Sequence, residues 1–106
     1  MSSEETSVFG ARLKEARLRV GLSQKQLGIA AGLDPFVAST RINRYELGIH
    51  KVDYQFAGKL ATVLSIPVAY LYADNPMLAE LIDAFGRLPR ERQGQLLSYA
   101  SDLLEQ

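Results

Sequence analysis

The stretch Gly21–Gly48 reads GLSQKQLGIAAGLDPFVASTRINRYELG and decides the fold. Ser23 with Gln26 three residues later is typical of a capping box at a helix start. Asp34 followed by Pro35 is a second start signal, because aspartate caps helices and proline fits the first helical position. Gly32 stands between the two signals, where a helix end requires a left-handed residue. The stretch therefore predicts two short helices, 24–31 and 35–47, joined by a tight turn.

The rest of the chain contains the same kinds of helix-start and helix-end signals. Apolar residues recur at helical spacing between the prolines and glycines, and no segment alternates like a half-buried strand. We therefore expect an all-α chain, with Ile42 and Tyr45 on the buried side of the helix at 35–47. The other predicted helices span residues 6–20, 53–65, 68–73, 77–87 and 90–105.

The exposed side of the helix at 35–47 is small, polar and basic. Arginine can pair with guanine edges and asparagine with adenine edges in the DNA major groove. A helix of this kind, behind a shorter helix and a tight turn, is the layout of a helix-turn-helix DNA reader. The candidate base-reading residues are Ser39, Thr40, Arg41, Asn43 and Arg44. We expect contacts to the DNA backbone from Gln24, Lys25 and Lys51.

A longer pattern surrounds this motif and carries a family resemblance. Its residues are Phe9, Gly10, Leu13, Arg17, Gly21, Leu22, Ser23, Gln24, Leu27, Ala30, Gly32, Ile42, Arg44, Glu46, Gly48, Leu60, Ala61, Leu64 and Leu71. In combination they resemble the Cro/repressor-like helix-turn-helix family, also called the xenobiotic-response-element (Xre) family. The resemblance implies a five-helix lambda-repressor-like DNA-binding domain that acts as a dimer in transcriptional control. It also implies a structural ion pair between Arg17 and Glu46.

The chain departs from the family pattern between Gly32 and Ile42, where it has about four more residues. Four residues make roughly one helical turn, so we expect the second helix of the motif to start one turn early, at Pro35. The added turn could clash with the DNA groove or reach a phosphate. It could also pack on the protein through Phe36 and Val37.

The C-terminal segment predicts an amphipathic helical hairpin. Its apolar residues follow the i, i+3, i+4, i+7 pattern in both helices, and helices this short must pack on something. We divide the chain into a DNA-binding domain at 1–73 and a dimerisation segment at 74–106; packing back onto the chain's own domain is the alternative. The candidate dimerisation residues are Leu78, Leu81, Ile82, Phe85, Leu96, Leu97, Leu103 and Leu104.

Composition limits the other functions. The chain has no cysteine, one histidine and no phosphate-cradling glycine loop, so we expect no enzyme, no metal site, no cofactor and no small-molecule ligand. No apolar run suits a membrane helix, and the N-terminus has no apolar stretch of a signal peptide. The absence of cysteine fits a cytoplasmic protein. The net charge is zero, but residues 1–60 hold nine basic and six acidic side chains, whereas residues 61–106 hold three and six. The basic excess lies in the half that carries the motif.

These patterns favour a sequence-specific transcriptional regulator, a repressor of phage or bacterial type. It would bind a near-palindromic operator in double-stranded DNA as a homodimer, through the helix at 35–47. One alternative is an antitoxin whose C-terminal helices hold a toxin partner. Another is a protein-interaction adaptor that has lost DNA binding.

Overall fold

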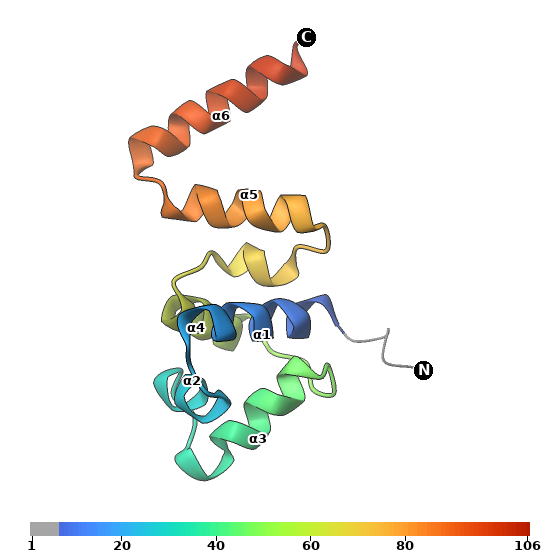
Figure 1. Ribbon diagram of the computed structural model, residues 1–106, viewed down its shortest axis with the longest axis vertical. Helices are drawn as coiled ribbons and strands as arrows, with labels where there is room; N and C mark the ends of the chain where they lie inside the picture. The colour runs from blue at the N-terminus through green and yellow to red at the C-terminus, as the bar shows by residue number, and fades with distance from the viewer. Residues whose placement is uncertain (1–6) are drawn as a thin grey trace.

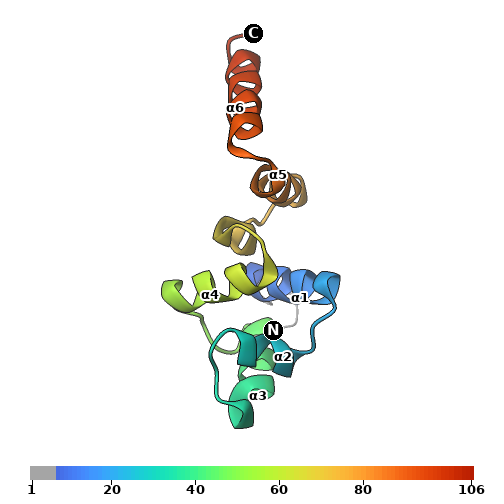
Figure 2. The ribbon, with the colours of Figure 1, turned by 90° about the vertical axis from the view of Figure 1, so that its left-hand side faces the viewer.

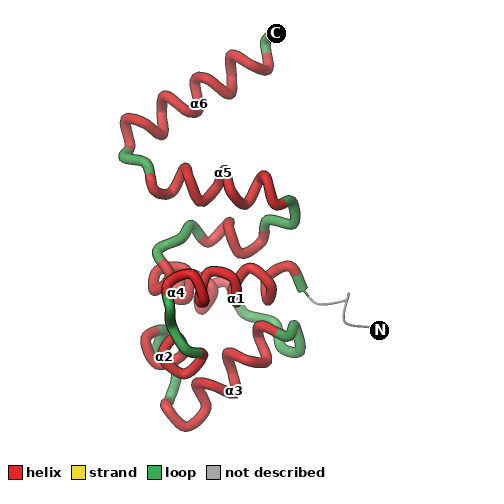
Figure 3. Tube along the Cα trace, in the orientation of Figure 1, coloured by secondary structure: helices red, strands yellow, loops and turns green. Residues whose placement is uncertain are grey.

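The computed structural model describes residues 7–106, and this part of the chain is all-helical, as the sequence predicts (Figure 3). The fifth element is a 3-10 helix, labelled η2, and the others are α-helices. The elements are α1 (Val8–Val20), α2 (Gln24–Ala30), α3 (Pro35–Glu46), α4 (Tyr54–Leu64), η2 (Val68–Tyr72), α5 (Pro76–Arg87) and α6 (Arg90–Leu104). Residues 1–6 lie outside the described residues. Two expectations fall on them: the start of the first helix at residue 6 and the absence of a signal peptide.

The helix ends use the residues that the sequence marks for them. Ser23 and Gln26 form a complete capping box at the start of α2. Asp34 caps α3 through a hydrogen bond from the Phe36 N–H, and Pro35 occupies the first turn. Gly21 closes α1 with a φ of 79°, a left-handed conformation that glycine adopts without strain. Local side-chain chemistry therefore fixes where each of these helices begins and ends.

The core lies between α1, α2, α3, α4 and η2, and its side chains come from the apolar stripe of each helix (Figures 1 and 2). Val20, the last residue of α1, is exposed. The residues with the largest fully buried side chains are Leu13, Leu27, Ile42, Leu60, Leu64 and Leu71. At about 25 cal/mol per Å² of apolar surface, their burial is the main favourable term in folding.

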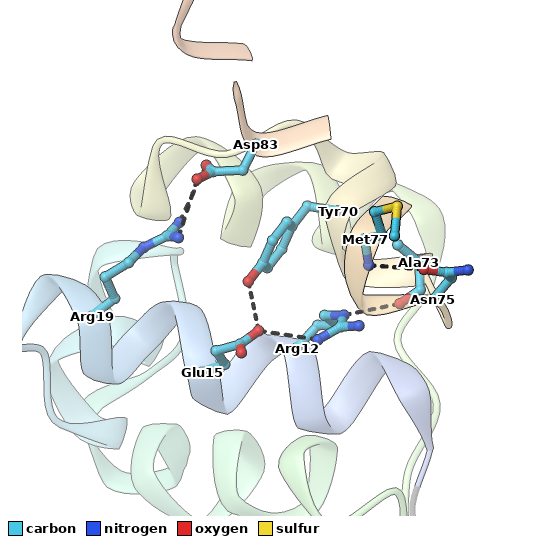
Figure 4. Close-up of polar contacts among 8 residues, drawn as sticks. All are labelled: Arg12, Glu15, Arg19, Tyr70, Ala73, Asn75, Met77 and Asp83. Atoms are coloured by element: carbon cyan, nitrogen blue, oxygen red, sulfur yellow. Dashed lines mark hydrogen bonds and ion pairs between the residues drawn. The ribbon is translucent and has the colours of Figure 1, made fainter. Parts of the chain in front are cut away.

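An ion pair fastens α5 to α1. The Arg19 guanidinium donates from Nη1 and Nη2 to the two carboxylate oxygens of Asp83, at 3.2 and 3.3 Å (Figure 4). Asp83 also accepts from Arg87 Nε, one turn later on α5, at 3.2 Å. Ala79 of α5 is buried, and Ile82 packs against the core. The first half of the predicted C-terminal hairpin thus packs on the chain's own domain along one side.

Tyr70 of η2 supplies a second link in the same place. Its hydroxyl donates to Glu15 Oε1 of α1 at 2.5 Å, and Arg12 Nε donates to the Ala73 carbonyl at 2.9 Å (Figure 4). Burial raises the pKa of the Tyr70 phenol, and the hydrogen bond to Glu15 raises it further. The guanidinium groups of Arg12 and Arg19 lie 5.8 and 5.6 Å from the ring centre. These contacts hold η2, and the start of α5 that follows it, against α1.

α6 projects from this body and buries none of its side chains. It diverges from α5 after the turn at Leu88 and Pro89, so the molecule measures 52 × 33 × 23 Å. Its radius of gyration is 15.5 Å, against about 13 Å for a compact chain of this length. Within residues 7–106 the apolar side chains of α6 are exposed, except that of Leu96, which is half-buried. No helix in this part of the chain is long and apolar enough to cross a membrane.

Candidate nucleic-acid interface

The motif is built by a close crossing of α2 and α3. Gly28 lies against Ala38, and a Cβ atom on Gly28 would sit only 2.7 Å from the Ala38 Cβ. Leu27 and Ile42 are both fully buried in the core beside this crossing. Small residues at the crossing let the two backbones approach closely.

α3 has one buried and one exposed side. Ala38, Ile42 and Tyr45 face the core, as predicted for the last two, and so does Glu46. The structure places all the candidate base-reading residues on the surface: Ser39, Thr40, Arg41, Asn43 and Arg44. In Figures 1 and 2 the start of α3 lies at the opposite end of the molecule from the C-terminus. Nothing in residues 7–106 covers the exposed side.

A buried hydrogen-bond network supports this exposed side from behind. Arg17 Nε donates to Glu46 Oε2 at 2.6 Å and Nη2 donates to Oε1 at 3.1 Å, with both side chains almost fully buried. Gln24 Nε2 donates to Glu46 Oε1 at 3.0 Å and to Asn43 Oδ1 at 3.1 Å. The network thus runs from α1 through the ion pair to Asn43. It orients the Asn43 amide through its oxygen and uses neither of the two N–H donors of this exposed side chain.

Gln24 therefore has a role that the sequence did not reveal. It was expected to contact the DNA backbone, but both of its amide protons are used inside the protein and its side chain is partly buried. Lys25 next to it is exposed and makes no ion pair within the described residues. Of the two, Lys25 is the better placed for a phosphate contact.

Basic side chains gather beside the C-terminal half of α3. Arg41, Arg44 and Lys51 line a shallow hollow of about 560 Å³, together with His50. None of the three cations makes an ion pair within residues 7–106. An open, cationic hollow next to a polar helix face suits a DNA backbone, because most protein–DNA hydrogen bonds go to phosphate and sugar.

The structure also decides what the added turn at the start of α3 does. α3 begins at Pro35, as expected, but the Phe36 side chain does not pack on the protein, since 96% of the residue is exposed. Val37 is 39% exposed. The candidate site residues inferred from the sequence did not include Phe36. It stands four residues before Thr40 and lies on the same side of the helix. That spacing was the signal that could have found it.

Among the described residues no group of three or more His, Cys, Asp or Glu side chains is arranged to hold a metal ion.

Comparison with known proteins agrees with this geometry. The family model described as "Helix-turn-helix domain" matches residues 8–70, more than half of the chain. The crystal structure of the transcriptional regulator BswR superposes with a TM-score of 0.84 at 45% sequence identity, covering 91% of this chain and 95% of that one.

Two relatives carry the name of HTH-type transcriptional regulators, one from Sinorhizobium medicae (strain WSM419) and one from Rhizobium meliloti (strain 1021). Each is 26% identical over 95 residues, which are 90% of this chain. The chain spans 62% of the length of these curated relatives.

Proposed function

Because this chain belongs to the helix-turn-helix domain family, we propose that it is a DNA-binding transcriptional regulator that reads a specific operator through α3. The observation that carries the proposal is the uncovered polar and basic side of α3, held in place by the buried Arg17–Glu46 pair. The transcriptional regulators among the proteins it resembles support the same reading.

The proposed contacts are of two kinds, those to the DNA bases and those to the DNA phosphates. Thr40, Asn43 and Arg44 lie on the outer side of α3, across the helix from Ala38, Ile42 and Tyr45. They are the proposed base-contacting residues. Together with Ser39 and Arg41 at its two edges, they form the surface of α3 that we call the reading face. Lys25 and Lys51 flank the face and are the proposed phosphate contacts. Binding is therefore expected to weaken as salt rises, with a slope of about −0.9 per phosphate contact.

Substituting an arginine of the reading face tests the assignment. Arg44→Ala is expected to weaken binding to the operator by about 1–3 kcal/mol, because a guanidinium that pairs with a guanine edge is lost. The measurement is fluorescence anisotropy with DNA from upstream of the protein's own gene, against scrambled DNA, over a salt series. Arg90→Ala removes the same charge from the exposed start of α6 and serves as the matched control. Operator affinity of Arg44→Ala equal to that of the control would refute the assignment of the reading face.

We further propose that the protein acts as a homodimer joined through α6 and the outer side of α5. Leu97, Leu103 and Leu104 of α6 are 65%, 50% and 88% exposed, and Leu81 and Phe85 of α5 are 50% and 42% exposed. Ile82 is less suited to this role because it packs on the core of its own domain. A two-fold axis through these faces would leave both α3 helices free, since α3 lies at the other end of the molecule (Figure 1).

Removing α6 separates dimerisation from folding. A chain that ends at residue 88 is expected to stay folded, because α6 buries none of its side chains. It should sediment as a monomer and bind the operator about 100-fold more weakly, since the two heads are no longer linked. In the full chain, Leu97→Ser should weaken the dimer and Ser98→Ala, on the polar side of α6, should not. A truncated chain that remains a dimer would contradict the proposal.

Repression of a promoter by operator occupancy is the mode of action that we propose, with a near-palindromic operator matching the two-fold symmetry. The Cro/repressor-like subfamily remains a prediction from the motif.

The exposed side of α6 would also suit another protein, so the antitoxin and adaptor alternatives predict a stable heteromeric complex in place of the homodimer. Sedimentation of the purified full chain, alone and with the products of neighbouring genes, distinguishes them.

A further inference from the structure

The exposed ring of Phe36 at the start of α3 is the least covered large apolar side chain in residues 7–106. It is 96% exposed, although its own N–H is held by the Asp34 carboxylate at 2.8 Å, so the backbone that carries it is fixed. Phenylalanine gains from leaving water, and the described part of the chain offers this ring no place to do so. A rigidly mounted, uncovered ring is suited to contact something outside the chain.

The position of Phe36 on the helix indicates which surface it serves. Phe36, Thr40, Asn43 and Arg44 follow i, i+4, i+7, i+8 spacing, so they form one stripe along α3. This stripe lies opposite the buried side chains and is the reading face of the proposed function. Side chains on a helix lean toward its N-terminus, so the ring extends the stripe beyond the tip of α3. That tip is the part of the molecule farthest from the C-terminus (Figure 2).

The surroundings of the ring favour DNA over a second protein. Val37, Thr40, Arg41 and Arg44 line a hollow of about 230 Å³ with Phe36. Two unpaired guanidinium groups beside an apolar ring suit a surface that carries phosphates and one apolar group. In the major groove of unmodified DNA the only apolar group on a base edge is the C5-methyl of thymine, which phenylalanine and other apolar side chains contact.

We propose that Phe36 packs against the C5-methyl group of a thymine in the operator. It would thereby specify a base that the hydrogen-bonding residues of the reading face do not reach. The added turn at the start of α3 then lengthens the stretch of DNA that the helix reads. This inference rests on the proposed function, because it requires α3 to lie in the major groove.

Uracil substitution tests the contact with a change of one methyl group. An operator is selected from random-sequence DNA with the wild-type protein, and each thymine is then replaced in turn by deoxyuridine. One replacement in each half-site is expected to weaken wild-type binding about fourfold, the value of burying a single methyl group. The same replacement should leave the affinity of Phe36→Ala unchanged, because this variant has no ring to lose the contact.

A matched variant and a folding control make the result specific. Tyr54→Ala removes another exposed aromatic ring, at the start of α4, and should keep the fourfold response to uracil whatever its overall affinity. Thermal melting should show that Phe36→Ala is as stable as wild type, since almost none of the side chain is buried. Selective wild-type binding with no uracil response, or with the same response in Phe36→Ala, would overturn this inference alone. Failure of the wild-type protein to select any DNA would overturn the proposed function and this inference together.

Discussion

Glu46→Ala is expected to lower the free energy of unfolding by about 3–5 kcal/mol. Arg17 is 7% exposed, and its guanidinium has Glu46 as its only carboxylate partner in residues 7–106. Removing that carboxylate leaves a charge buried without a counter-ion, and a buried charge without a partner is far less stable than one in water. The measurement is urea denaturation followed by circular dichroism at neutral pH.

The loss of stability in Glu46→Ala should be much larger than that caused by removing an exposed carboxylate. Glu80→Ala removes an exposed glutamate of α5 and is expected to change stability by less than about 0.5 kcal/mol. Replacing both partners, as in Arg17→Met with Glu46→Leu, should cost less than Glu46→Ala alone, because no charge is left behind. A loss below about 1 kcal/mol in Glu46→Ala would show that Arg17 reaches water or another partner.

The same substitution should also disturb DNA reading. Glu46 accepts from Gln24, which donates to Asn43 on the reading face. Loss of Glu46 therefore frees the Gln24 amide and removes the fixed orientation of Asn43. The hydrogen bonds of Gln24 thus link the buried ion pair to a residue of the proposed interface.

Gly10→Ala is expected to destabilise the protein by about 2–3 kcal/mol through overpacking. Gly10 of α1 lies against the C-terminal turn of α3, and an added Cβ would sit 2.8 Å from the Tyr45 carbonyl oxygen while colliding with the Glu46 carbonyl. Backbone atoms cannot rotate away as a side chain can, so α1 and α3 must separate. The gain of up to about 1 kcal/mol from alanine's helix propensity is too small to offset this.

Gly58→Ala is the matched control for this prediction. Gly58 also lies within a helix of the same domain, but a Cβ there would meet no atom within 4 Å. It should therefore show the propensity gain alone, about 0.5–1 kcal/mol of added stability. Thermal or urea unfolding of both variants measures the difference. Equal stabilities would show that α1 and α3 do not approach as closely as the structure indicates.

Local patterns in the sequence determined the secondary structure of this protein. A cap depends on residues two or three positions apart, so Ser23 with Gln26 and Asp34 with Pro35 were sufficient to mark the starts of α2 and α3. Helical spacing of apolar residues was sufficient to identify the buried side of α3, and with it the exposed side that is proposed to read DNA. The family resemblance added the pairing of Arg17 with Glu46, which lie 29 residues apart.

Only the tertiary structure decided which residues from distant segments meet. Gln24 reaches Asn43 and Glu46 instead of solvent, Arg19 holds Asp83 of α5, and the backbone of α3 comes close to Gly10. The sequence also left open whether the Phe36 side chain is buried, since an apolar residue one turn before Thr40 can be packed on the protein or exposed to solvent. Each outcome depends on the angle and distance between packed helices, which follow from the fit of whole side chains across the core and leave no local trace in the sequence.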